Sequence, residues 1–522
     1  MELLARQRHE LKTKINLHHD PITSHLPLEL VSQVFLEYLA MANSGQWEYR
    51  PRAHPADYAP SEWFPDPVFG FKTGLRSPQS ILRLVCKNWQ QIALRTPQLW
   101  ATLRVDLDMR DPAQVVRRYL ELAGSLPMNL CISQTTTDND DDSDSDAPET
   151  ASQAGARVQA SLLEVMKNNG QRWKSVYLFL PCELAKRFCS RLKLTATVLH
   201  TLVVYPITDP DDPGEVIELT KLKSLRCLRY YGLDIESSVD VAWRNLTHYY
   251  NWHAWEEELL TVLKLAPRLT HCEAATNQGP WGAADISPLI HRNLRNLQYF
   301  AQEQGIILEL ITLPSLQELI FEWDEFTELK ILTDFLLRSN CRLTHLTLRG
   351  QYFRTDEKGG KIDMLQVLEH LPTITHLRFC SSTLGEKPHI FNISHLFLTQ
   401  FWKLAPQDRS SGPWVCPLLQ VLEIEGVLQW DFTWIVFLEV LEHRSQALPM
   451  LASVQQASRA GKSPLQRVSL RTEHAATSLP PIDRETAFEL LAYRKSGLMI
   501  EIIDCCKRDH LKAALQHHGL DL

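Results

Sequence analysis

The stretch Leu316-Gln317-Glu318-Leu319-Ile320-Phe321 sets the fold of most of the chain, because its apolar pattern recurs. Apolar residues occupy its first, fourth and sixth positions, and clear copies begin at residues 316, 343, 374, 393, 419 and 465. Weaker copies begin at residues 199, 225 and 294. Starts from Leu316 to Leu419 are separated by 27, 31, 19 and 26 residues. A recurring period of this length predicts one structural unit built many times.

Each copy is predicted to form a short strand, and many copies are preceded by an apolar helical stretch. These helical stretches cover residues 259–265, 329–337, 364–371, 432–441 and 486–492. One strand and one helix cannot enclose a hydrophobic core, so neighbouring units must stack to bury their apolar faces. The sequence therefore predicts a curved solenoid that ends near Ile503 and continues into a helical tail.

The repeat resembles the leucine-rich repeat in its spacing and in its pattern of leucines. It departs from that family where an asparagine is usual, because the corresponding positions hold Asp324, Gln351, Ser382, Phe401 and Val427. This departure favours irregular repeats over a regular horseshoe. A doubly wound α/β domain with a flat sheet requires the same alternation of strands and helices, and it stays open as the alternative fold.

The N-terminal region carries a second pattern, which predicts helices. Leu26-Pro27-Leu28 suits the start of a helix, because proline is tolerated in the first turn. Two neighbouring apolar stripes then follow, Leu30/Val34/Tyr38 and Val31/Phe35/Leu39. A second helix is predicted from Ser77-Pro78 to Ala93, with Thr96-Pro97 ending it.

Two short helices cannot bury two wide apolar faces on each other. Full burial of each Leu, Val or Phe side chain is worth roughly 1.5–3 kcal/mol, so the remaining surface must find another partner. The residues alone leave two partners open: the C-terminal part of this chain, or a second protein.

The order Leu26-Pro27, then Val85-Cys86-Lys87-Asn88-Trp89, then Leu99-Trp100 resembles the F-box. In that family two helices dock substrate receptors onto cullin-RING ubiquitin ligases through a Skp-type adaptor. The resemblance covers residues 21–103 and implies the adaptor-binding residues Leu26, Pro27, Leu30, Val34, Phe35, Ile81, Leu82, Val85 and Trp89. Here residues 42–76 are inserted between the two helices, and similar insertions are familiar in the F-box-like proteins of mushroom-forming fungi.

These patterns predict an N-terminal helical F-box-like module followed by an irregular leucine-rich-repeat solenoid, an α part joined to an α/β part. The expected segments are a lead-in helix (1–20), the module (21–105, with a loop at 42–76), a connecting segment or first repeat (106–133), an acidic disordered linker (134–153) and the solenoid (154–522). The linker holds six aspartates between Asp138 and Asp146. Their spacing is close to that of a calcium loop, but Ser143 stands where glycine is required, so no metal is expected.

Composition excludes several functional classes. The net charge of −8 argues against a broad basic surface for nucleic acid. The 11 cysteines lack Cys-x-x-Cys spacing, which is typical of reduced thiols in the cytoplasm or nucleus. No apolar run is long enough to cross a membrane, and no catalytic or cofactor motif is present. We therefore expect a binding protein without a cofactor, and an enzyme hidden in the repeats would require a cleft of convergent titratable groups.

On a solenoid the side chains between the repeat leucines are exposed, and those expected to contact a target are Arg349, Arg378, Phe397, Glu423 and Arg471. The resemblance implies a substrate-recognition subunit of an SCF-type ubiquitin ligase. Its module would bind a Skp-type adaptor and thereby the cullin complex, and its solenoid would bind a target protein. A protein-interaction scaffold outside ubiquitin ligation stays open as the alternative.

Overall fold

The computed structural model divides the chain into two compact units, Met1–Leu246 and Thr247–Leu522, which are described separately. The described residues are 4, 7, 8, 10, 11, 14, 20–47, 78–134, 149–206, 217–219, 221–230, 239–277, 288–301, 307–323, 329–350, 367–380, 391–394, 416–426, 428–431, 434–445, 465–472, 481–504 and 508–520. The loop predicted at residues 42–76 lies largely outside them, as do most of the lead-in helix and residues 135–148 of the acidic linker.

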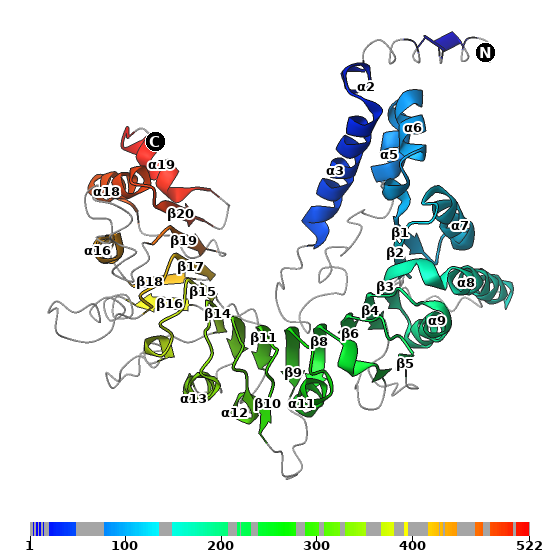
Figure 1. The fold of residues 1–522 in the computed structure, drawn as a ribbon. Helices are drawn as coiled ribbons and strands as arrows, with labels where there is room; N and C mark the ends of the chain where they lie inside the picture. Colours follow the sequence, from blue (N-terminus) through cyan, green and yellow to red (C-terminus); the bar gives the residue numbers. More distant parts are fainter. Residues whose placement is uncertain are drawn as a thin grey trace. The chain divides into compact units, whose positions relative to one another are not determined.

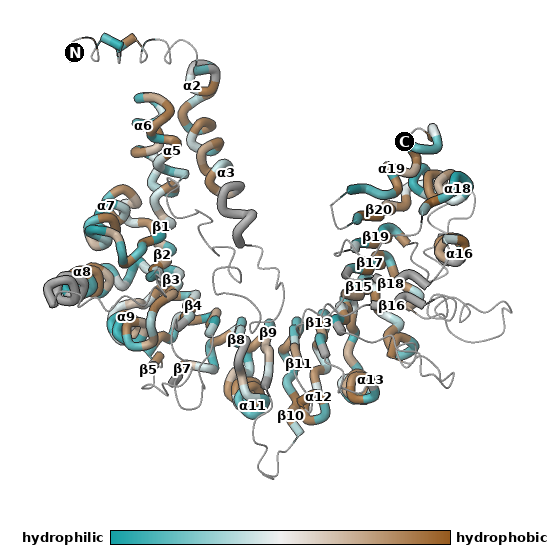
Figure 2. The backbone as a smooth tube through the Cα atoms, turned by 180° about the vertical axis from the view of Figure 1, so that it is seen from behind, coloured by the Kyte–Doolittle hydropathy of each residue, from teal (hydrophilic) through white to brown (hydrophobic). Residues whose placement is uncertain are grey.

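The first unit begins with a group of short helices. They are α2 (Pro21–His25), α3 (Leu28–Trp47), α5 (Pro78–Val85), α6 (Lys87–Leu94) and the 3-10 helix η2 (Pro97–Trp100). Apolar residues recur along α3 and α5 (Figure 2). One stripe of α3 is buried among the other helices, and its members are Val31, Phe35 and Leu39. The ring of Phe35 lies 4.8 Å from the ring of Trp89, which ties α3 to α6.

The helix predicted from residue 78 to residue 93 is in fact two helices, because the chain turns at Cys86. Cys86 is extended, and its sulfur accepts a hydrogen bond from the backbone N–H of Trp89 at 3.4 Å, which caps α6. Asp20 likewise starts a helix, because its side chain caps the short helix α2 by accepting from the N–H groups of Ile22 and Thr23. Short polar side chains at both positions compete with the helix ladder and restart it.

A parallel ladder of strands follows the helices in the first unit. Its strands are β1 (Thr102–Asp106), β2 (Met128–Ser133), β3 (Trp173–Leu180), β4 (Thr201–Pro206) and β6 (Cys227–Tyr230), adjacent in that order. Helices α7 (Pro112–Leu122), α8 (Glu149–Asn168) and α9 (Cys182–Thr195) lie along one face of them (Figure 1). The short strands β5 (Ile217–Leu219) and β7 (Val239–Val241) pair with each other.

The elements of this ladder differ from two of the predicted segment boundaries. The strands begin at Thr102, so the helical module ends near Trp100 rather than at residue 105. The predicted connecting segment, residues 106–133, contains α7 and β2, and β2 pairs with β1. Helix α8 begins at Glu149, so residues 149–153 are helical where the acidic linker was expected to continue.

The second unit contains nine strands of one ladder in its described part. They are β8 (His248–Trp255), β9 (His271–Asn277), β11 (Asn296–Ala301), β13 (Glu318–Trp323), β14 (His345–Gly350), β15 (His376–Cys380), β17 (Val421–Gly426), β19 (Arg467–Thr472) and β20 (Met499–Ile503), adjacent in that order and parallel. Helices α11 (Glu256–Leu265), α12 (Ile307–Leu310) and α13 (Leu329–Ser339) lie along one face (Figure 1). Helices α16 (Trp434–Ser445), α18 (Arg484–Lys495) and α19 (His510–His517) follow.

The strand register explains why the repeat pattern predicts the fold. One register row across neighbouring strands consists of buried apolar residues: Leu319, Leu346, Leu377, Leu422, Val468 and Ile500. Eight of the nine predicted copies supply strands of the two ladders. The copy beginning at residue 393 is the exception, because β16 (Phe391–Ser394) pairs with β18 (Leu428–Asp431) in a separate two-stranded sheet. The result is a mixed helix and strand fold with a mostly parallel sheet.

Candidate interaction surfaces

Helix α3 presents apolar side chains on two neighbouring faces. The buried face holds Val31, Phe35 and Leu39, and Phe35 is only 1% exposed. The face one residue earlier in each turn stays open: Leu30 is 52% exposed, Val34 is 41% exposed and Tyr38 is also exposed. A third face is polar, with Gln33 donating a hydrogen bond to Glu37 at 2.9 Å. The open apolar face therefore differs from ordinary helix surface.

Helix α5 adds a second open apolar face. Ile81, Leu84 and Val85 are exposed there, while Leu82 is buried at 4% exposure. Leu26 and Leu28, around the start of α3, are exposed as well. We call the eight exposed residues the apolar surface: Leu26, Leu28, Leu30, Val34, Tyr38, Ile81, Leu84 and Val85. Contiguous exposed apolar side chains of this kind mark interaction sites in folded proteins.

The structure separates the nine predicted adaptor-binding residues into two groups. Six are exposed, namely Leu26, Pro27, Leu30, Val34, Ile81 and Val85. Of the other three, Phe35 and Leu82 are buried inside the module, where they pack the helices together, and Trp89 is half-buried. Leu28 and Leu84 are exposed as well, although neither was predicted to contact the adaptor.

Trp89 has a positioning role within the module. Its indole N–H donates to the Asp20 carboxylate at 2.8 Å, and its ring packs on Phe35. Burial alone raises the pKa of Asp20, but hydrogen bonds from Thr23, Trp89 and Ile22 outweigh it and hold the pKa below its ordinary 3.8. Asp20 thus joins α2 to α6 as a carboxylate at neutral pH.

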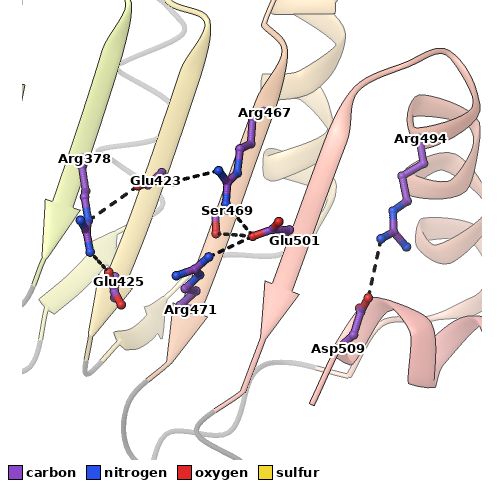
Figure 3. Close-up of polar contacts among 9 residues, drawn as sticks. All are labelled: Arg378, Glu423, Glu425, Arg467, Ser469, Arg471, Arg494, Glu501 and Asp509. Carbon is purple, nitrogen blue, oxygen red and sulfur yellow. Dashed lines mark hydrogen bonds and ion pairs between the residues drawn. The ribbon is translucent and has the colours of Figure 1, made fainter. Parts of the chain in front are cut away.

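A chain of ion pairs crosses the last strands of the second unit (Figure 3). Arg378 contacts Glu425 and lies 3.7 Å from Glu423 in the neighbouring strand. Arg467 contacts Glu423 at 3.7 Å and Glu501 at 3.0 Å. Arg471 completes the chain by contacting Glu501 at 3.1 Å. These three arginines and three glutamates are the ion-pair chain, and their charges cancel.

The predicted target-contacting residues belong largely to such pairs. Arg378, Glu423 and Arg471 are members of the ion-pair chain, and Arg349 lies 3.7 Å from the buried Glu322. Phe397 lies outside the described residues. The charges of these four side chains therefore already have partners within the sheet.

Nothing in the described cysteines points to nucleophilic chemistry. Burial raises the pKa of Cys189 to about 12 and that of Cys380 to about 11, so both stay protonated thiols near neutral pH. Low thiol pKa values are what reactive cysteines require. In the part of the chain that the structure describes, no three His, Cys, Asp or Glu side chains are grouped as ligands for a metal ion.

Among the described helices, none combines the length and apolar character needed to cross a membrane. Comparison of the sequence with models of known protein families found no match. A search of curated proteins likewise found no similar protein.

Proposed function

We propose that this protein is a substrate-recognition subunit of a cullin-RING ubiquitin ligase. Its helical module binds a Skp-type adaptor, and its repeat region binds the protein to be ubiquitinated. The observation that carries this proposal is the apolar surface, because six of the nine positions that resemble adaptor-binding residues of the F-box are exposed.

The energetics favour a partner for this surface. Leu30, Val34 and Val85 each keep about half of their side-chain surface exposed, and burying the rest is worth roughly 1 kcal/mol for each. The remaining members of the apolar surface add similar amounts. The sum is enough to drive association with a helical partner that supplies a matching apolar face.

The order of the strands favours the solenoid over the doubly wound alternative. In each unit the main-ladder strands are neighbours in the order in which they occur in the chain. A doubly wound sheet instead reverses direction at a switch point between strands. Stacked repeats place side chains of many strands on one face, which suits recognition of an extended protein surface.

In the proposed function, the protein acts by tethering its target to the ligase. An adaptor-bound module and a target-bound repeat region hold the target close to the ubiquitin-charged enzyme of the ligase. Attack by a target lysine then becomes effectively intramolecular, with a high effective concentration.

Adaptor binding tests the proposal. Titration calorimetry of the full chain with a purified Skp-type adaptor should show micromolar or tighter binding. Leu30→Asp should weaken it by at least about 100-fold, because a charge would be placed against an apolar partner. Gln33→Asp is the matched control, since Gln33 lies on the exposed polar face of the same helix, and it should bind like the wild type.

Two results would count against the ligase assignment. If the wild type shows no micromolar affinity for the adaptor, the apolar surface serves another partner. If Leu30→Asp and Gln33→Asp bind equally well, the adaptor uses a different face. Binding to the adaptor without recruitment of the cullin would favour the scaffold alternative.

A further inference from the structure

A three-residue motif recurs where strands of the second unit begin. Its four copies are Leu246-Thr247-His248, Leu269-Thr270-His271, Leu343-Thr344-His345 and Ile374-Thr375-His376. Each histidine is the first residue of its strand, in β8, β9, β14 and β15 respectively. The proposed leucine repeat requires only the apolar residue, so the threonine and histidine need a separate explanation.

The histidines align in one register row. His248 stacks on His271 with ring centroids 4.2 Å apart, and His345 stacks on His376 with centroids 4.1 Å apart. Asn296 and Glu318 fill the same row in the two strands between these pairs, and Asn296 donates a hydrogen bond to Glu318. We call these six residues the histidine row: His248, His271, Asn296, Glu318, His345 and His376.

The threonines fix the tautomer of three of the rings. The hydroxyl of Thr270 donates to the carbonyl of Thr247, so it can only accept from His271, whose Nδ1 lies 2.9 Å away. The hydroxyls of Thr344 and Thr375 likewise donate to backbone carbonyls, and each lies 2.9 Å from Nδ1 of the next histidine. Nδ1 therefore carries the proton, and Nε2 presents an acceptor lone pair when the ring is neutral.

This geometry disfavours a metal site. The stacked rings are inclined by only 7° and 16°, so the Nε2 lone pairs within each pair cannot converge on one ion. Ligands of a tetrahedral ion must approach it from widely different directions. Parallel lone pairs instead suit separate hydrogen-bond donors spaced along a partner.

The histidine row lies on one face of the sheet, and the net charge of that face depends on whether the histidines are protonated. The described strand residues there include six carboxylates and four guanidinium groups: Glu273, Glu318, Glu322, Glu423, Glu425 and Glu501, with Arg349, Arg378, Arg467 and Arg471. The net charge is −2 with the four histidines neutral and +2 with all four protonated. Acidification therefore reverses the sign of the face.

The surroundings of His271 and His376 favour the neutral forms of these two rings. Burial lowers the pKa of His271, aided by Arg295 and opposed by Glu318. Burial also lowers the pKa of His376, aided by His345 and opposed by Glu423 and Glu318. Placing two positive charges in one stacked pair is unfavourable, so protonation of one ring opposes protonation of its stacked neighbour.

We propose that the histidine row is a docking surface for a basic, donor-rich segment of a partner protein, and that acidification releases this segment. At neutral pH the Nε2 lone pairs and the Glu318 carboxylate accept hydrogen bonds from arginine or lysine side chains. The net negative charge of the face complements such a segment. Protonation removes the acceptors and adds repulsion at the same positions. The inference deepens the proposed function, since it assigns the chemical class of the target, but it does not require adaptor binding.

The test uses the full chain and a fluorescent peptide of alternating arginine and glycine. Fluorescence anisotropy at constant ionic strength should show binding at pH 7.5 that weakens at least about tenfold at pH 5.0. An alternating glutamate and glycine peptide should not bind at pH 7.5. The double variant His345→Gln, His376→Gln keeps acceptor oxygens that do not titrate, so it should bind the arginine peptide at pH 7.5. Because two of the four histidines are replaced, the change in log Kd between pH 7.5 and pH 5.0 should be about half of that in the wild type. His370→Gln is the matched control, because His370 is exposed but lies outside the strands.

Three outcomes would overturn the inference: no binding of the arginine peptide at pH 7.5, preferential binding of the glutamate peptide at that pH, or an unchanged pH dependence in the double variant. Glu318→Gln should weaken binding at pH 7.5, and an unaltered affinity would also contradict the proposed row. Leu30→Asp separates this inference from the proposed function, because it should abolish adaptor binding and leave peptide binding unchanged.

Discussion

Replacing Phe35 by alanine tests the distinction between packing and docking that the structure makes in the helical module. Phe35 is 1% exposed and its ring lies 4.8 Å from that of Trp89. Removing a buried phenylalanine costs about 3–5 kcal/mol, and loss of the aromatic pair is part of that cost. Leu30→Ala removes a side chain that is 52% exposed, so it should cost less than about 1 kcal/mol.

Hydrogen–deuterium exchange measured by mass spectrometry reports how much each substitution destabilises the helical module. Peptides from residues 87–94 should lose protection by at least about 100-fold in Phe35→Ala, because each 1.4 kcal/mol corresponds to a factor of ten. Leu30→Ala should change the same protection by less than about fivefold. Equal effects of the two substitutions on exchange would refute the assignment of Phe35 to the interior. The assignment would also be refuted if Phe35→Ala lost adaptor binding while exchange of residues 87–94 stayed unchanged.

Three further predictions follow from polar contacts. Asp20→Ala removes the cap of α2 and the acceptor for Trp89, so protection of α6 should fall by about 1–3 kcal/mol in the same exchange experiment. Glu501→Gln breaks the contacts with Arg467 and Arg471, and thermal unfolding should show a loss below about 2 kcal/mol that shrinks at high salt. Burial lowers the pKa of His376 below 6.5, so below that pH the folded state binds fewer protons than the unfolded chain. Stability therefore falls as the pH drops below 6.5, and the Tm at pH 5 should be lower than the Tm at pH 7.5. His376→Gln should reduce this difference in Tm.

The repeat pattern predicted strands well where leucines mark both buried positions. Strand β13, with Leu319 and Phe321, follows the six-residue rule, and the register aligns it with its neighbours. Strand β8 escaped the rule because its buried positions hold Tyr249 and Asn251. A leucine pattern cannot detect a strand whose buried positions hold aromatic or polar residues.

The site residues were harder to predict than the fold, for a geometric reason. Helical spacing identifies Leu30 and Phe35 equally well as apolar, but it does not say which face meets the neighbouring helix. That choice depends on where α6 lies, which is set by the cap at Cys86 and the bond from Trp89 to Asp20. The charged strand residue Arg378 poses the same difficulty, because its partners Glu423 and Glu425 lie in a strand at least 45 residues later in the chain.

The two surfaces differ in the forces they can use, and this difference makes them separable in solution. The apolar surface acts by removing hydrocarbon from water, which varies little with pH and is not screened by salt. The sheet face of the second unit acts through charges and hydrogen bonds, whose strength falls with ionic strength and, at the histidine row, with protonation. A partner retained in high salt at pH 5 therefore occupies the apolar surface, whereas a partner released under either condition occupies the sheet. Under the proposed function, this division would keep attachment to the adaptor constant while the choice of target responds to conditions.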